Sequence, residues 1–222
     1  MTSRFGWRGG RLPFHAALAI APDRWSAKPL TPAALIVYAF ALALGLGVST
    51  AWFAVSGEYP IGAVRVGPWT SWPQVGSSSA DPYARAIVTR RAEIPLATGE
   101  GLALTATIDG QGRDLDSACT YRVGSTTPQA RLWTLTIYDR NGALVSSELE
   151  RSGFTSTEVL REPDGRFFVA LSRQLQPGNW LKLPAGGRFS MTLRLYDTPA
   201  ALGAGAVDPR SLPAIERTEC GA

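Results

Sequence analysis

The stretch "WTLTIYD" (Trp133–Asp139) recurs almost unchanged as "MTLRLYD" (Met191–Asp197). Successive side chains of a β-strand point to opposite faces, so each copy places apolar residues on one face and Thr, Arg or Tyr on the other. Both copies are therefore predicted to be core strands. Each ends in an Asp, and an Asp at a strand end usually accepts hydrogen bonds from the following turn. The alternative is that the two carboxylates form a catalytic pair.

Most of the chain around these two copies has the same pattern of short alternating segments separated by turn residues. The other predicted strands include "LALTATID", "CTYRV", "ALVSS", "TSTEVLRE" and "RFFVALSR". Asp139–Gly142 and Pro163–Gly165 have the chemistry of hairpin turns, because Gly and Asn accept a positive φ. One short helix is predicted from the N-cap Asp81 to about Ala92, with Pro82 at its first position. The pattern is typical of an all-β sandwich.

One apolar run, "PAALIVYAFALALGLGVSTAWFAV" (Pro32–Val55), contains no Asp, Glu, Lys, Arg or His. As a helix it would be about 36 Å long, enough to cross a hydrocarbon core of about 30 Å. We therefore expect a single transmembrane helix. The competing interpretation is a cleaved signal peptide, because Ser49–Ala51 offers small residues for cleavage. The length of the run favours an uncleaved signal anchor.

The net charge of +4 is confined to the residues before the apolar run. Residues 1–31 hold five basic side chains and one acidic side chain, whereas the rest of the chain holds seventeen of each. Lys and Arg stay on the cytoplasmic side of short flanking segments. The N-terminus is therefore predicted to be cytoplasmic and the C-terminal domain periplasmic, in the inner membrane of a bacterium. The neutral outer domain lacks the basic face that nucleic-acid binding requires.

These observations divide the chain into four parts. They are a basic cytoplasmic arm (1–31), a transmembrane helix (32–55), a linker around one possible strand (56–80) and an extracytoplasmic β-sandwich domain (81–222). Both cysteines, Cys119 and Cys220, lie in the outer domain, where disulfides persist. We expect them to pair and to hold the C-terminal segment against the domain. The alternative is a buried thiol at Cys119 and an unpaired Cys220.

Three motifs within Trp133–Pro199 resemble the bacterial family called Domain of Unknown Function 1214. They are "LWTLTIYD", "PDGRFFVAL" and "GNWLKLPAGGRFSMTLRLYD". The resemblance implies a jelly-roll-like antiparallel β-sandwich, often found C-terminal to a companion domain, Domain of Unknown Function 1254, which is not visible here. Lys182 stands where the family commonly has Pro, and Asp197-Thr198 stands where an aromatic residue or Gly often follows the Tyr. The resemblance implies a fold and no activity.

The residue types limit the chemistry that the outer domain can perform. The only histidine is His15, so the domain has no imidazole for a Ser-His-Asp triad or a histidine metal site. We predict no cofactor and no metal. Glycoside hydrolysis needs two facing carboxylates, one of them with a raised pKa. The available candidates, among which the spacing selects no pair, are Asp114, Asp116, Asp139, Glu148, Glu150 and Asp197.

A non-catalytic binding module needs only aromatic platforms and a few polar groups. The candidate ligand-binding residues are Tyr138, Asn179, Trp180, Arg194 and Tyr196. Each also has a structural interpretation: Trp180 closing the end of the sandwich, Asn179 closing a turn, and Arg194 forming an ion pair with a neighbouring strand.

The preferred hypothesis is an envelope protein anchored in the lipid bilayer, whose sandwich binds a companion envelope protein or a cell-wall glycan. The alternative is a carbohydrate-active hydrolase that uses paired carboxylates. The sequence leaves open whether the chain is an enzyme, and it favours a non-catalytic role.

Overall fold

The computed structural model describes residues 31–56, 62–91, 93–125, 128–145, 151–199 and 207–221. The predictions for the basic arm, His15, Glu148 and Glu150 lie outside these residues. The chain divides into two compact units, Met1–Gly47 and Val48–Ala222. The description below therefore concerns the apolar helix and the β-rich part separately.

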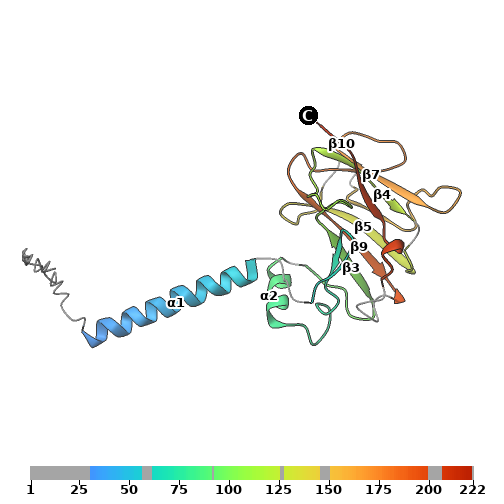
Figure 1. Cartoon of the computed structure of the whole chain (residues 1–222). Helices are drawn as coiled ribbons and strands as arrows, with labels where there is room; N and C mark the ends of the chain where they lie inside the picture. The colour runs from blue at the N-terminus through green and yellow to red at the C-terminus, as the bar shows by residue number, and fades with distance from the viewer. Residues whose placement is uncertain are drawn as a thin grey trace, which may run out of the picture. The chain divides into compact units, whose positions relative to one another are not determined.

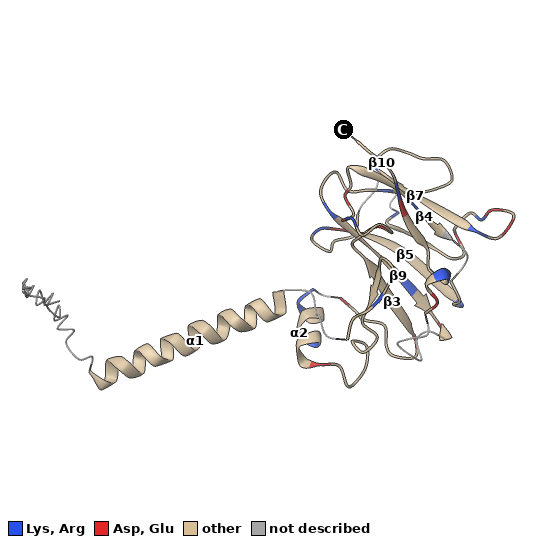
Figure 2. Ribbon diagram, viewed as in Figure 1, with Lys and Arg blue, Asp and Glu red and all other residues tan. Residues whose placement is uncertain are grey.

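Helix α1 (Pro32–Ser56) coincides with the apolar run, so the predicted helix is confirmed. It has 25 residues and a mean hydropathy of 2.0, and none of its residues is buried. In Figure 2 its ribbon is tan throughout, so it contains no Lys, Arg, Asp or Glu. It is the one helix in the described ranges that is long and apolar enough to cross a membrane. A membrane anchor and a signal sequence both have these properties.

Helix α2 (Pro82–Arg90) begins where the sequence predicts it. The Asp81 side chain accepts a hydrogen bond of 2.8 Å from the backbone N–H of Tyr83, which satisfies one of the unpaired donors of the first turn. Ala84 and Ile87 form its buried face. The capping chemistry read from the sequence is thus confirmed in the structure.

The strands form two sheets, which confirms the mainly β fold (Figure 1). The six-stranded sheet contains, in spatial order, β1 (Val64–Val66), β2 (Trp69–Ser71), β3 (Gly101–Ala106), β9 (Phe189–Tyr196), β5 (Leu132–Asp139) and β6 (Gly153–Thr155). The four-stranded sheet contains β10 (Ala214–Cys220), β4 (Cys119–Ser125), β7 (Phe167–Ser172) and β8 (Asn179–Lys182). Strands β1 and β2 lie within the predicted linker 56–80, so part of that stretch belongs to the sheet.

The two repeated phrases are neighbouring antiparallel strands, β5 and β9. In their register Trp133 stands opposite Leu195, and Ile137 stands opposite Met191. All four side chains are at most 2% exposed, as the alternating pattern predicts. The opposite face carries the Thr, Arg and Tyr side chains, as predicted.

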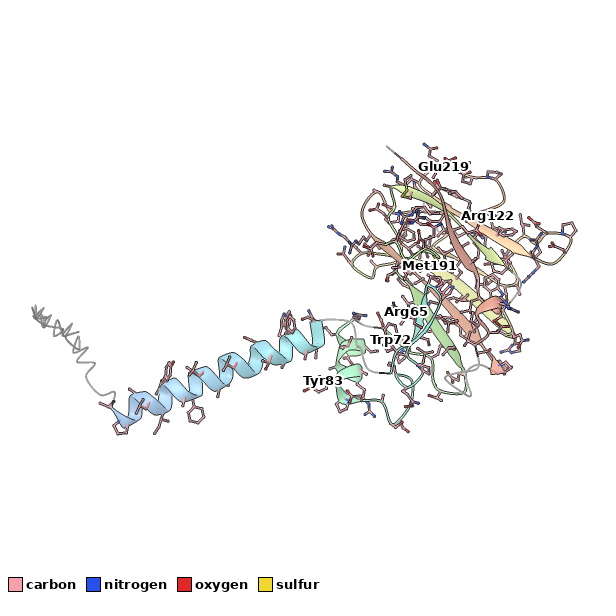
Figure 3. All side chains as sticks on the ribbon, viewed as in Figure 1. Arg65, Trp72, Tyr83, Arg122, Met191 and Glu219 are labelled. Atoms are coloured by element: carbon pink, nitrogen blue, oxygen red, sulfur yellow. A yellow bond between two sulfur atoms is a disulfide. The ribbon has the colours of Figure 1, made fainter. Side chains whose placement is uncertain are left out.

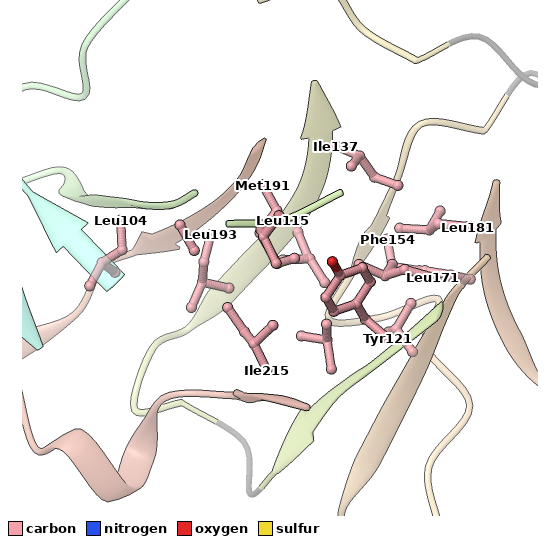
Figure 4. Packing of buried hydrophobic residues seen from close by; sticks show 14 of the residues in the cluster. Leu104, Leu115, Tyr121, Ile137, Phe154, Leu171, Leu181, Met191, Leu193 and Ile215 are labelled. Carbon is pink, nitrogen blue, oxygen red and sulfur yellow. The ribbon is translucent and has the colours of Figure 1, made fainter. Parts of the chain in front are cut away.

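A filled interior separates the two sheets (Figure 4). The Trp133 ring of the larger sheet stacks on Phe167 of the smaller one at 4.6 Å between centroids. Tyr121 of β4 meets Phe189 of β9 edge to face at 5.5 Å. Apolar side chains from both sheets complete the interior, including Leu104, Leu181 and Met191. Burial of this shared interior is what holds the sheets face to face.

Strand β8 departs from the predicted fully antiparallel sandwich, because it runs parallel to β7. Parallel neighbours usually need a crossover of a dozen or more residues. Here Asn179 pairs with Val169, so the chain has to return only about 10 Å along the strand direction after Ser172. A short connection spans that distance because both strands are short.

The stretch "TSTEVLRE", predicted to be a strand, is mostly a turn, and that prediction is wrong. Only Thr155 lies in β6; after it the backbone N–H of Val159 returns to the carbonyl of Thr155 at 3.3 Å. The Glu158 carboxylate accepts from the backbone N–H of Thr155 at 3.2 Å. A Thr followed three residues later by Glu is the pattern of a capping box, which favours a turn over a strand.

The C-terminal segment forms β10, which pairs with β4 at the edge of the smaller sheet. Cys220 stands opposite Cys119 in this pairing, and the two form the predicted disulfide. Thus the cystine attaches the C-terminal segment to the domain, as expected. Ile215 alone of the β10 side chains is fully buried.

Candidate functional site

The outward side of the six-stranded sheet carries polar side chains from all six of its strands. We call this set the hydroxyl face: Arg65, Thr70, Thr105, Thr134, Thr136, Tyr138, Thr155, Ser190, Thr192, Arg194 and Tyr196. Every member carries a hydroxyl group except the two arginines, and none carries a carboxylate. Hydroxyl groups both donate and accept hydrogen bonds, so the face offers donors and acceptors at once.

A row of four threonines crosses the centre of this face. Thr70 pairs with Thr105, Thr105 with Thr192, and Thr192 with Thr136, on four successive strands. The hydroxyl oxygens of Thr105 and Thr192 are 3.4 Å apart. Neighbouring strands lie about 4.8 Å apart, so the threonine row spans about 14 Å. Arg65, labelled in Figure 3, pairs with Thr70 and extends the row at one end.

Arg194 and Tyr138 meet above the threonine row. The Arg194 guanidinium lies 5.9 Å from the centre of the Tyr138 ring. Tyr138 stands opposite Ser190, four residues before Arg194, so the two side chains reach toward each other over Thr192. Thr192 lies between Ser190 and Arg194 on β9 and is only 8% exposed. Within the described residues Arg194 has no carboxylate partner, so its contact is with an aromatic ring rather than the ion pair considered from sequence.

Tyr196, the third candidate on this face, stands between Gly101 of β3 and Leu132 of β5. Its side chain is half-buried. The Leu96 side chain lies close above Gly101, within 3.1 Å of where a Cβ would stand. The structure therefore brings Tyr138, Arg194 and Tyr196 onto one surface, of which the Tyr196 end is next to the segment that precedes β3.

Asn179 and Trp180, the other two candidates, lie on β8 in the smaller sheet. The Asn179 amide accepts from the backbone N–H of Leu160 at 2.7 Å and donates to the carbonyls of Leu160 and Phe168 at 2.8 and 2.9 Å. Trp180 donates its ring N–H to the carbonyl of Ser172 at 3.1 Å. Both side chains thus have structural partners, and they lie in a different sheet from the other three.

The repeated Asp residues do not face each other. Because β5 and β9 are antiparallel, Asp139 pairs with Phe189, eight positions before Asp197. At about 3.3 Å per residue the two lie about 26 Å apart along the strands, whereas glycoside hydrolysis needs carboxylates within about 10 Å.

The two Asp residues also have different partners. Asp139 accepts from the backbone N–H groups of Asn141 and Ala143, both at 2.8 Å, which confirms its predicted role in the turn. Asp197 differs: its carboxylate pairs with Arg131 at 3.2 Å, and its backbone is left-handed, with φ 51°.

The two other described candidate carboxylates, Asp114 and Asp116, are also engaged in local structure. Asp114 pairs with Arg188 at 2.7 Å, and Asp116 accepts from the backbone N–H of Ala118 at 2.8 Å. In the described ranges no group of three or more His, Cys, Asp or Glu side chains is placed to hold a metal ion.

A separate cleft lies where the β1–β2 turn, the loop 109–113 and β10 meet. Asp109 is 1% exposed there and pairs with Arg113 at 2.8 Å and with Arg217 at 3.2 Å. Burial favours the neutral acid, but hydrogen bonds from the Arg113 backbone and guanidinium and from the Gln111 backbone outweigh it. They hold the Asp109 pKa below its ordinary value of 3.8. Asp109 is therefore a stable anion, unlike a general acid with a raised pKa.

Sequence reasoning missed both the threonine row and the Asp109 cluster. The alternation of Thr along each strand was visible, but their alignment across four strands depends on register. The segment "DGQGR" identifies a turn at Asp109, and nothing local indicates that Arg217, far along the chain, completes the ion pair.

The fold and these surfaces define a two-sheet β-sandwich domain with a filled interior and a half-buried polar face on the larger sheet. Residues 100–200 match the family model described as "Protein of unknown function (DUF1214)", which confirms the resemblance found in the sequence. No curated protein matches the chain.

Two solved structures are similar. The VPA0106 protein from Vibrio parahaemolyticus has a TM-score of 0.52 and 20% identity, over 64% of this chain and 36% of that one. A putative uncharacterized protein from Burkholderia cenocepacia has a TM-score of 0.42 and 15% identity, over 81% of this chain and 43% of that one. The chain thus spans less than half the length of either protein, and the first similarity supports the fold alone.

Proposed function

We propose that this chain is a single-pass inner-membrane protein whose periplasmic β-sandwich binds a cell-wall glycan on the hydroxyl face without catalysis. The observation that carries the proposal is the grouping of Tyr138, Arg194 and Tyr196 with the threonine row on one half-buried surface, the hydroxyl face, none of whose named members carries a carboxylate.

The chemistry of the hydroxyl face favours a glycan over a protein partner. A sugar presents hydroxyl groups that donate and accept hydrogen bonds, and the hydroxyl groups of the threonine row can accept from them and donate to them. Tyrosine rings add apolar area with a polar tip, and a guanidinium adds donors in a fixed geometry. Protein–protein hot spots, in contrast, are poor in Ser and Thr. A companion envelope protein is therefore the second outcome that the binding experiment has to distinguish.

Membrane anchoring is supported by the apolar helix and by the charge asymmetry around it. Five of the six charged side chains before the helix are basic, which favours a cytoplasmic N-terminus. A retained helix keeps the hydroxyl face within reach of the cell wall. A cleaved signal sequence would instead release the domain.

The anchoring part is tested with two measurements on one strain. An alkaline phosphatase fused to the C-terminus is expected to be active, because that enzyme works only outside the cytoplasm. Mass spectrometry of the purified chain is expected to find residues 32–56 still attached. An inactive reporter contradicts the topology, and a new N-terminus near Ala51 contradicts the anchor while leaving the glycan proposal standing.

The binding part is tested with the full chain in detergent micelles against cell-wall sacculi and soluble polysaccharides. Arg194→Gln is expected to weaken binding by at least about tenfold, because a hydrogen bond from a charged donor contributes about 1.5–3 kcal/mol. Arg122→Gln is the matched control, because Arg122 lies 3.5 Å above the Phe168 ring on the other sheet. Equal glycan binding by the two variants would show that the glycan does not bind at Arg194. Glycan turnover would contradict the non-catalytic role. Recovery of only a companion protein would replace the glycan as ligand.

A further inference from the structure

The cleft beside Asp109 is a second concave surface, and none of its lining residues belongs to the hydroxyl face. Its volume is about 410 Å³, within the range of small-molecule sites. Three chain segments form it: the turn between β1 and β2, the loop 109–113, and residues 209–217 before and within β10. The backbone N–H of Gly110 donates to the carbonyl of Ile215 at 2.8 Å, which fixes the loop against β10.

Apolar and conformationally stiff residues form part of the walls, opposite the charged groups around Asp109. Val66, Pro68, Leu212 and Pro213 line the cleft together with Trp69. The Trp69 ring N–H donates to the carbonyl of Pro213 at 2.9 Å, so the β1–β2 turn and the segment before β10 are held together across it. A proline has a fixed φ and no N–H, so Pro68 and Pro213 present apolar surface without a backbone donor.

In this cleft the Asp109 carboxylate faces two guanidinium groups, so one positive charge is not neutralised by it. Asp109 is shared by two arginines, but Arg217 is only 15% exposed and also donates to the carbonyl of Asp114. Arg113 is 46% exposed and uses only its Nε for Asp109. Among the described residues its two terminal nitrogens have no partner. The buried carboxylate therefore neutralises one guanidinium and orients the other.

Glu216 also borders the cleft, so its carboxylate is a second possible partner for the Arg113 guanidinium. Ile215 points into the interior, so the next side chain along β10 points to the outer side of the smaller sheet. There it stands opposite Arg122 in the strand pairing. The anion nearest to the Arg113 guanidinium is therefore Asp109, which is already paired.

We propose that this cleft binds the carboxylate of a small apolar molecule, with the terminal nitrogens of Arg113 as the recognising group. A guanidinium presents parallel N–H donors that match the two oxygens of a carboxylate. The Asp109 contact at Nε holds that fork in place before the ligand arrives, which lowers the ordering cost of binding. The apolar walls take the body of the ligand, and they select against a strongly hydrated dianion such as phosphate.

The test uses isothermal titration calorimetry on the full chain in detergent micelles. N-acetyl-leucine represents the C-terminal residue of a peptide, 4-methylpentanoate represents a simple carboxylic acid of similar shape, and N-acetyl-leucinamide removes the negative charge. We expect at least one acid to bind at least tenfold more tightly than the amide, and the acid that binds better identifies the source. Binding of the amide as tightly as the acids, or binding of inorganic phosphate alone, overturns the proposal. Failure of both acids to bind overturns it as well.

Arg113→Gln adds a test at the residue itself, with an expected loss of about tenfold in acid binding. Arg131→Gln is the matched control, because Arg131 also pairs through Nε with a carboxylate, that of Asp197, at 3.2 Å. Unchanged acid binding in Arg113→Gln contradicts the assignment. If that variant does not fold, the comparison of acid with amide on the natural chain still decides. A glycan that binds the hydroxyl face leaves this result unaffected, so the two proposals fail independently.

Discussion

Two Asp-Gly turns in this molecule have nearly the same local chemistry and different surroundings. Asp109 and Asp164 each accept a backbone N–H in their own turn, and each accepts an arginine Nε, from Arg113 at 2.8 Å and from Arg166 at 2.6 Å. Both have a pKa below the ordinary value, for Asp109 against the opposing effect of burial and for Asp164 chiefly through the Arg166 backbone N–H. Asp109 is buried beneath β10, whereas Asp164 is exposed.

The comparison shows that burial, rather than turn chemistry, decides what an ion pair contributes. An exposed pair gains little because water already solvates both ions. A buried carboxylate depends on its partners, since losing them leaves an unsolvated charge. Arg217, on β10, is the partner that only Asp109 has. Its presence depends on the strand that the disulfide holds in place.

The largest effect is expected when the disulfide is removed. Cys119→Ala with Cys220→Ala opens a cross-link between residues 101 apart, which in the chain-entropy model costs about 4.7 kcal/mol of unfolding free energy. Detachment of β10 would also expose Asp109 and make it resemble Asp164. Urea unfolding monitored by tryptophan fluorescence measures the loss. Exchange of the Ile215 and Arg217 amide protons should rise in the same variant, and an unchanged midpoint would contradict this role of the cystine.

The next effect is that of Asp109→Asn, expected to lower the unfolding free energy by about 3 kcal/mol. Breaking a buried ion pair from one side costs about 3–5 kcal/mol, and partial exposure of Arg113 reduces this. The same urea titration measures it. An effect as small as that of the exposed Asp164 would show that solvent reaches the cluster.

The pH dependence of stability gives a smaller and more specific effect. The Asp109 pKa is lowered in the folded chain, so its contribution is fully present above the unfolded pKa of about 4. It is lost as the pH falls through the folded pKa. The difference in unfolding free energy between the natural chain and Asp109→Asn should therefore shrink as the pH falls below the unfolded pKa of about 4 and through the lower folded pKa. A difference that stays constant over this range would contradict the assignment.

Asp164→Asn is expected to have the smallest effect, with no resolvable shift of the urea midpoint. The turn keeps its Gly165 in a left-handed backbone (φ 82°), and water replaces the lost charge. Raising the ionic strength should remove any residual difference from the natural chain. A midpoint shift comparable to that of Asp109→Asn would invalidate the comparison.

The contrast between local sequence and tertiary surroundings also explains which parts of the fold were predictable. Strands β5 and β9 alternate strictly, so their buried faces were read correctly from Trp133 and Met191 onward. Strand β10 has one buried side chain and several charged ones, because edge strands are commonly charged, and its pattern carried no strong signal. Strand β8 is short and parallel to its neighbour, and neither property is visible locally.

The candidate site likewise contains some residues whose positions were predictable from the sequence and others whose positions were not. The outward positions of Tyr138, Arg194 and Tyr196 follow from strand alternation, and the structure brings these three together. Asn179 and Trp180 lie in the other sheet. Their side chains form hydrogen bonds with backbone groups that no sequence motif indicates.

The sequence by itself determined the apolar helix, the helix cap at Asp81, the hairpin turns and the two faces of each long strand, because these depend on residues close together in the chain. The tertiary structure alone decided the alignment of the threonine row, the pairing of Asp109 with Arg217 and the place of β10. Each of these joins residues far apart in sequence through strand register and burial, which appear only when the two sheets enclose a common interior.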